Sequence, residues 1–135
     1  PWPGVVGSSL ELFLDFRTPD QGLGEAHYGK GVYQLLIRPE LPGVQAALWS
    51  PQLPDAAQRG VTVTGETTRE GYIVRLTLPW RAFGLQRVPE SFGFDLGLNG
   101  VFPDQAKRKT QLMLFGTAQN FRSAADFGRV YTSDN

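Results

Sequence analysis

Residues 71–84, GYIVRLTLPWRAFG, restrict the fold of this chain more than any other stretch. Its first half places every second residue on one face of an extended strand: Tyr72, Val74, Leu76 and Leu78. Pro79 then removes a backbone donor, which ends regular pairing. The apolar segment that follows fits one helical turn, with Gly84 as its end. The pattern predicts a half-buried central strand, entered through a hairpin turn at residues 68–71, that leads into an apolar plug over a sheet, with Trp80 in the core.

The same two-residue alternation recurs along the chain. It predicts further strands at residues 8–16, 32–38, 44–49, 61–68, 92–99, 110–115 and 127–132. Turns separate them, consistent with 16 glycines and 10 prolines among 135 residues, and no long helix-period segment is present. Apart from short helical turns, one of them at residues 123–126, the sequence predicts a single all-β domain over residues 1–135. Its expected architecture is an antiparallel β-sandwich of jelly-roll or immunoglobulin-like type.

Charge and composition exclude several classes of partner and site. Thirteen basic and thirteen acidic residues balance, which gives no support for nucleic acid as a partner. No apolar run approaches the length of a membrane span, so a membrane partner is not expected either. The absence of cysteine removes disulfides, thiolate metal sites and cysteine nucleophiles.

In two predicted strands, the face opposite the apolar one has an unusual composition. In residues 8–16, Glu11 and Asp15 alternate with Phe13, a pattern that usually indicates a solvated sheet face. The two carboxylates would lie about 13 Å apart along the strand, too far for a glycosidase pair. In residues 92–99, the outward positions are small or polar, which predicts that something packs closely on them. These positions are Gly93, Asp95, Gly97 and Asn99.

The sequence favours a binding site over a catalytic one. It contains no nucleophile elbow, phosphate loop or metalloprotease motif, and its single histidine, His27, lies in a loop. Sugars need aromatic faces for their C–H surfaces and carboxylates, amides or guanidiniums for their hydroxyls. Polar candidates occupy the outward strand positions Glu11, Gln34, Arg38, Asn99 and Gln111. Trp2, Trp49 and Tyr28 are the aromatic candidates, and Trp2 is the preferred one.

Four blocks occur in the order found in family 9 carbohydrate-binding modules, which the chain therefore resembles. They are SSLELFLD at residues 8–15, GYIVRLTLPW at 71–80, FGFDLGLN at 92–99 and ADFGRV at 125–130. The resemblance implies a non-catalytic sugar-binding β-sandwich that accompanies a carbohydrate-active enzyme. It also implies secretion, to the periplasm or outside the cell, and a structural calcium ion. Glu11 is similar to a family residue that hydrogen-bonds the sugar, and the position near Gln111 is comparable.

The resemblance also implies that strands preceding residue 8 are missing. Without them, residues 8–16 would leave an exposed sheet edge. We therefore expect this edge to pair with a second copy in a homodimer, or with an N-terminal segment.

Two other functions stay open at this level. The family holds its sugar between two tryptophans, whereas the late strand here has Leu114 and Phe115, so the sandwich could serve structure or protein interaction without a sugar site. Related folds bind haem between a methionine and a histidine or lysine, for which Met113 and His27 are the candidates.

Overall fold

The computed structural model describes residues 9–40, 45–70, 72–100 and 110–132. The strands are β1 (Ser9–Asp15), β2 (Val32–Glu40), β3 (Gln45–Trp49), β4 (Thr62–Thr67), β5 (Tyr72–Thr77), β6 (Ser91–Gly100), β7 (Thr110–Met113) and β8 (Gly128–Tyr131). The helical elements are single turns: η2 (Pro19–Gln21), α1 (Asp55–Gln58) and η3 (Trp80–Phe83). None of the helices in this part of the chain is long and apolar enough to cross a membrane.

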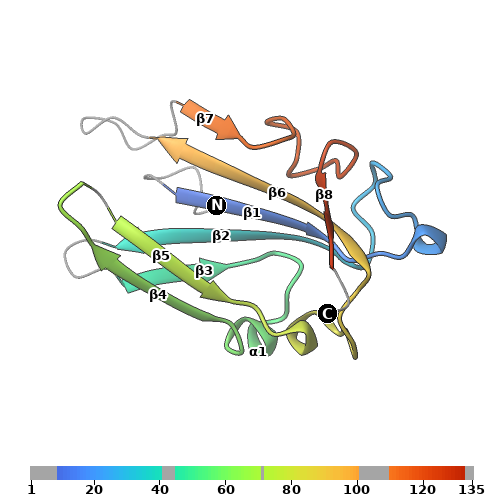
Figure 1. The fold of residues 1–135 in the computed structure, drawn as a ribbon, viewed down its shortest axis with the longest axis horizontal. Helices are drawn as coiled ribbons and strands as arrows, with labels where there is room; N and C mark the ends of the chain where they lie inside the picture. Colours follow the sequence, from blue (N-terminus) through green and yellow to red (C-terminus); the bar gives the residue numbers. More distant parts are fainter. Residues whose placement is uncertain (1–8, 41–44, 71, 101–109, 133–135) are drawn as a thin grey trace.

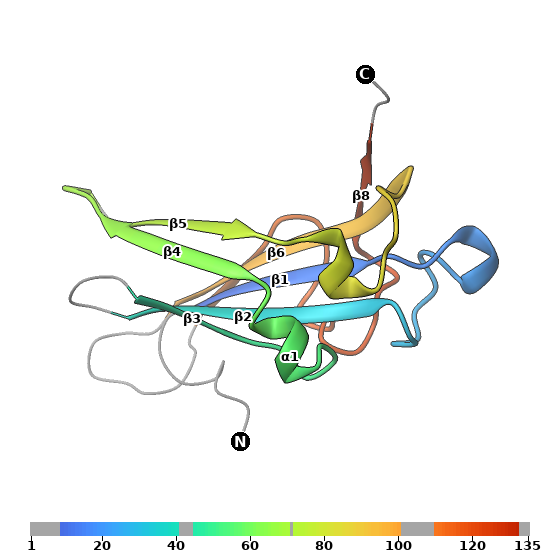
Figure 2. The ribbon, with the colours of Figure 1, turned by 90° about the horizontal axis from the view of Figure 1, so that it is seen from below.

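The strands form the predicted antiparallel β-sandwich. One layer is a sheet in the order β3-β2-β1-β6-β7, and β8 pairs with the other end of β6. The second layer is the β4–β5 hairpin, which lies over one side of that sheet (Figures 1 and 2). We call the sheet face toward the hairpin the inner face. The opposite face, which carries Glu11, is the outer face.

The core lies between the hairpin and the inner face. It contains the even-numbered apolar residues of β1, as their period-two spacing predicts, and apolar residues of β2 and η3. The Phe16 ring is its centre, since four other rings lie within 6.2 Å of it, centroid to centroid. These rings belong to Tyr33, Trp80, Phe83 and Phe92.

The stretch 71–84 has the predicted local structure but a different place in the fold. A strand is followed by the turn η3, which ends at Gly84 with a left-handed φ of 74°. Phe83 is the buried residue of this turn, whereas Trp80 is only half-buried against Phe16. The strand itself, β5, pairs only with β4 among the described residues, so it does not lie at the centre of the sheets. That place belongs to β1.

The expected free edge at residues 8–16 is wrong for the described strand. β1 is hydrogen-bonded along its length to β2 on one side and to β6 on the other. The sequence of β1 has apolar side chains on both faces, as expected for an interior strand, and its two neighbours are β2 and β6 of this same chain. A homodimer or an additional segment cannot pair with this strand.

The hairpin leaves part of the inner face uncovered. Figure 1 shows β4 and β5 over β2 and β3, with β6 and β7 clear of them. On β6 and β7, Leu98 and Leu112 are direct cross-strand neighbours, and Leu114 follows two residues later. Their side chains are 44%, 68% and 58% exposed. We call these three residues the leucine strip.

The outer face of β6 is covered, as its small residues predict. Residues 114–127 cross the sheet on the side away from the hairpin (Figure 2). Asp95 anchors this loop, because its carboxylate accepts hydrogen bonds from the backbone N–H groups of Phe115 and Gly116 and from the Asn120 amide. The expectation that acidic positions on β1 face solvent is wrong, since Glu11 and Asp15 are 2% and 0% exposed. The helical turn expected at residues 123–126 is absent, and the chain there forms non-helical turns.

Candidate functional site

A cluster of polar side chains from four strands surrounds the Glu11 carboxylate on the outer face. Asn99 Nδ2 of β6 donates to Glu11 Oε1 at 2.8 Å. Gln34 Nε2 of β2 and Gln111 Nε2 of β7 donate to Oε2 at 3.4 and 3.5 Å. Asn99 also donates to Ser9 Oγ at 3.0 Å, a contact that the sequence analysis did not anticipate. The structure therefore brings together four of the six predicted site residues.

The strand order explains why residues so far apart in sequence meet. β1 lies between β2 and β6, and β7 lies beyond β6, so one row of the sheet collects side chains from four segments. Gly97 lies directly opposite Glu11 on β6, and its lack of a side chain lets Met113 pack close to the β6 backbone. A Cβ at Gly97 would lie 2.9 Å from Met113 Sδ.

Burial makes this cluster energetically demanding. Glu11, Gln34 and Asn99 are each at most 5% exposed, and a buried carboxylate is costly unless donors surround it. The amide N–H groups of Asn99, Gln34 and Gln111 donate to the two Glu11 oxygens and so offset part of this cost. In contrast, Gln111 Oε1 is buried without a hydrogen-bond partner. An acceptor in this position needs a donor that the described protein atoms do not supply.

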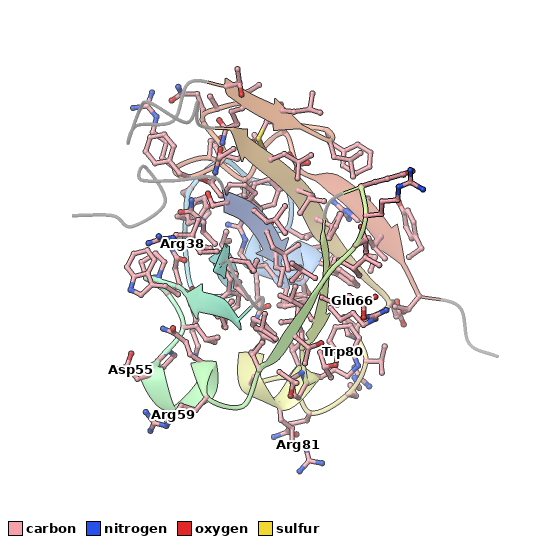
Figure 3. The ribbon with its side chains drawn as sticks, turned by 90° about the vertical axis from the view of Figure 1, so that its left-hand side faces the viewer. Arg38, Asp55, Arg59, Glu66, Trp80 and Arg81 are labelled. Carbon is pink, nitrogen blue, oxygen red and sulfur yellow. The ribbon has the colours of Figure 1, made fainter. Side chains whose placement is uncertain are left out.

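Arg38 and Trp49 lie on the same face beside the cluster. Arg38 is two residues beyond Leu36 on β2, and Leu36 is the direct neighbour of Glu11. Figure 3 shows Arg38 on the far side of the sheet from Glu66 and Trp80. Trp49 on β3 pairs with Leu36, which places it in the same row as Glu11. Trp2, the remaining predicted site residue, lies outside the described residues.

The opposite end of the outer face is closed by loops. The Tyr28 hydroxyl donates to the backbone oxygen of Asn120, and its ring meets Phe127 edge-on at 6.4 Å between centroids. Burial, together with the negative charges of Glu11 and Asp15, raises the pKa of Tyr28 well above its ordinary value. Tyr28 therefore belongs to the covering layer, so its predicted role as an aromatic contact for a sugar has no support here.

Asp15 has a structural partner that the sequence analysis missed. Arg17 donates through Nε and Nη2 to the two carboxylate oxygens, both at 2.8 Å, and the pair is buried. The same guanidinium donates to the backbone oxygens of Glu25 and His27, so it fixes the loop after β1. The hydrogen bond to Asp15 raises the pKa of Arg17. The sequence signal was the i, i+2 spacing of opposite charges at a strand end, which is weak by itself.

Two hollows on the surface lie away from the cluster. Both adjoin Phe16 and Arg17, with volumes of about 470 and about 900 Å³. The smaller reaches His27 and Lys30, and the larger runs along residues 84–91. Their linings contain no member of the Glu11 cluster.

Among the described residues, the ligand groups of the metal and haem sites that the resemblance raised are not brought together. In residues 9–40, 45–70, 72–100 and 110–132, no three histidine or acidic side chains lie close enough together to hold an ion. Met113 lies in the Glu11 row, whereas His27 contacts Arg17, which follows six residues after Glu11. That offset corresponds to about 20 Å along a strand, so the two haem candidates are not brought together.

Comparison with solved structures identifies the fold. A family 9 carbohydrate-binding module from Caldicellulosiruptor kristjanssonii, in complex with glucose, superimposes with a TM-score of 0.73 over 96% of this chain, at 17% identity. The chain has the fold of family 9 carbohydrate-binding modules. A structure of a family 9 module from the same organism in complex with cellotriose gives a TM-score of 0.71 over 98% of the chain, at 16% identity.

The chain spans 62% of the length of the glucose-bound structure and 67% of the cellotriose-bound one. No protein-family profile and no curated protein matches the sequence.

Proposed function

We propose that this chain is a non-catalytic carbohydrate-binding domain whose sugar contacts centre on Glu11. The observation that carries the proposal is the convergence of Glu11, Gln34, Asn99 and Gln111 from four strands, with Gln111 Oε1 lacking a donor. Solved structures of the same fold bind glucose and cellotriose, which supports the same class of ligand here.

The chemistry of the cluster suits a sugar hydroxyl. A hydroxyl can donate to Gln111 Oε1 or to a Glu11 oxygen and at the same time accept from an amide N–H. A hydrogen bond to an ionised carboxylate is stronger than one between neutral groups, so Glu11 would supply most of the polar recognition. Arg38 is half-buried at the border of the cluster and offers further N–H donors to a sugar hydroxyl, because a guanidinium has donors only.

Replacing Glu11 tests the proposal. Glu11→Gln keeps the size of the side chain and removes its charge, and we expect it to weaken glucose and cellotriose binding at least tenfold in calorimetry. Glu66→Gln is the matched control, because Glu66 is an exposed acid of the hairpin paired with Arg75. Unchanged affinity in a folded Glu11→Gln protein would reject the proposed site.

Association with a carbohydrate-active enzyme and secretion remain part of this proposal. Both come from the family resemblance. We also propose that further strands of a longer module cover the leucine strip, because the solved neighbours contain about half as many residues again as this chain. This replaces the earlier expectation of pairing at β1.

A second function is favoured by one observation. The leucine strip exposes three adjacent apolar side chains on the inner face, a feature typical of interaction surfaces. Under this alternative, the Glu11 cluster is a buried structural network and the sandwich binds no sugar. Absence of binding to any saccharide, with Glu11→Gln strongly destabilised, would favour the alternative.

A further inference from the structure

We propose that Met113 is a modification site, at which oxidation of the thioether to the sulfoxide disrupts the Glu11 cluster and abolishes sugar binding. The effect on sugar binding rests on the proposed function, whereas the effect on the cluster does not. Met113 is the only methionine among 135 residues, and the chain contains no cysteine. Sulfur oxidation in this protein therefore has one target atom, Met113 Sδ.

The strand register places the thioether beside the cluster. Met113 of β7 pairs with Gly97 of β6, and Gly97 pairs with Glu11 of β1, so the three residues share one row of the outer face. A Cβ at Gly97 would lie 2.9 Å from Met113 Sδ and 3.7 Å from Gln111 Nε2. The sulfur and the Gln111 amide therefore lie close to the same point above the β6 backbone, next to Glu11.

The sulfur is within reach of a small oxidant. Met113 is half-buried, and the two residues that follow it, Leu114 and Phe115, are 58% and 59% exposed. β7 is the last strand at its end of the described sheet, so among the described residues no strand pairs with its outer edge. A peroxide is little larger than water, and methionine oxidation depends on such access to the sulfur.

The reaction with a peroxide balances without a further reactant. A sulfur lone pair attacks one peroxide oxygen, an S–O bond forms and the O–O bond breaks. The second oxygen leaves with the proton of the first, as water when the oxidant is hydrogen peroxide. Sulfur is oxidised by two electrons and the peroxide is reduced by two. The product carries a polar oxygen acceptor on a side chain that was apolar.

The new acceptor competes with Glu11 for the Gln111 amide. Gln111 Nε2 donates to Glu11 Oε2 at 3.5 Å, a long hydrogen bond, so a sulfoxide oxygen nearby can accept this N–H instead. The negative end of the S–O dipole would also lie near the Glu11 carboxylate, which is 2% exposed. A buried carboxylate that loses a donor is destabilised. The cluster then rearranges, and the placement of Glu11 and Gln111 for a sugar hydroxyl is lost.

Peroxide treatment followed by calorimetry tests the proposal. Hydrogen peroxide is added to the folded chain until mass spectrometry shows one added oxygen at Met113, and the glucose affinity is compared before and after. We expect the affinity to fall at least tenfold, and methionine sulfoxide reductases to restore it. Unchanged affinity of the oxidised chain overturns the proposal. So does a Met113 that reacts more than about a hundredfold more slowly in the folded chain than in urea.

Met113→Leu is the matched control, because leucine has a similar volume and no sulfur. Its glucose affinity after peroxide is compared with its own affinity before treatment, and the two should be equal. The same loss in Met113→Leu would assign the effect to oxidation of another residue and would also overturn the proposal. Thermal melting of each sample shows whether it is folded.

A measurement without sugar separates this proposal from the proposed function. In NMR spectra of side-chain amides, oxidation should shift the Gln111 Nε2–H signals. The Gln58 signals should stay unchanged, since Gln58 donates to the backbone oxygens of Ser50 and Leu53 and not to the cluster. If the untreated chain binds neither glucose nor cellotriose but the Gln111 signals shift, the sugar function fails and the oxidation site stands. If glucose binds, and oxidation changes neither its affinity nor the Gln111 signals, the oxidation site alone is rejected.

Discussion

Three buried carboxylates on the outer face are stabilised in three different ways. Glu11 accepts from side-chain amides of three other strands. Asp15 forms an ion pair with Arg17. Asp95 accepts from backbone N–H groups of the loop at residues 115–116. Only the Glu11 arrangement uses groups that could exchange a protein partner for a sugar hydroxyl, because the other two hold the backbone in place.

We predict that Arg17→Ala destabilises the domain by about 3–5 kcal/mol, because it leaves the buried charge of Asp15 without its partner. Urea unfolding measures the loss. Arg75→Ala is the control, since its ion pair with Glu66 is more than half exposed on both sides and should contribute about 0–1 kcal/mol. Equal effects of the two substitutions would mean that Asp15 is solvated or has another partner in solution.

At the level of elements, close packing between β1 and β6 depends on glycine. A Cβ at Gly93 would lie 2.8 Å from Asp15 Cβ, an atom that cannot rotate away from the strand. A Cβ at Gly97 would instead meet Met113 Sδ, near the end of a flexible side chain. The two glycines lie on the same strand and the same face, so they differ mainly in the atom that an added Cβ would meet: a Cβ close to the backbone for Gly93 and a side-chain sulfur for Gly97.

Gly93→Ala should therefore destabilise by about 1–3 kcal/mol, whereas Gly97→Ala should cost clearly less, because Met113 can change rotamer. The larger Gly97→Val exceeds the space that Met113 can release and should destabilise by overpacking. Thermal or urea unfolding of the three variants gives the order. A Gly97→Ala protein less stable than Gly93→Ala would show that Met113 is rigidly held.

At the scale of the whole molecule, the hairpin is narrower than the sheet that it covers. Two strands face a sheet of six described strands, so the leucine strip on β6 and β7 stays exposed. Burying apolar surface yields about 25 cal/mol per Å², so such a strip favours contact with any apolar partner.

We expect the chain to bind an apolar dye and to associate as its concentration rises. Leu112→Ser combined with Leu114→Ser should reduce both effects, because these are the two most exposed members of the strip. Val88→Ser, which removes a 52% exposed apolar group elsewhere, should change neither. Dye fluorescence and sedimentation velocity measure the two properties. A double variant that still associates would place the contact on another surface.

The sequence by itself determined the strands and their faces, because side chains alternate every two residues along an extended backbone. It therefore placed Glu11, Gln34 and Asn99 at outward strand positions and located the turn that ends at Gly84. The same alternation could not show which strands are neighbours, since hydrogen-bonding edges look alike in every strand.

Only the tertiary structure decided the strand order, and with it the site. It gave β1 two neighbours instead of a free edge, placed the predicted β4–β5 hairpin in a layer of its own instead of at the centre, and buried Asp15 beneath a loop held by Arg17. The convergence of Gln111 with Glu11, 100 residues earlier, likewise follows from β7 joining β6. Such long-range pairings depend on how the whole apolar surface is shared between two layers, which no local pattern encodes.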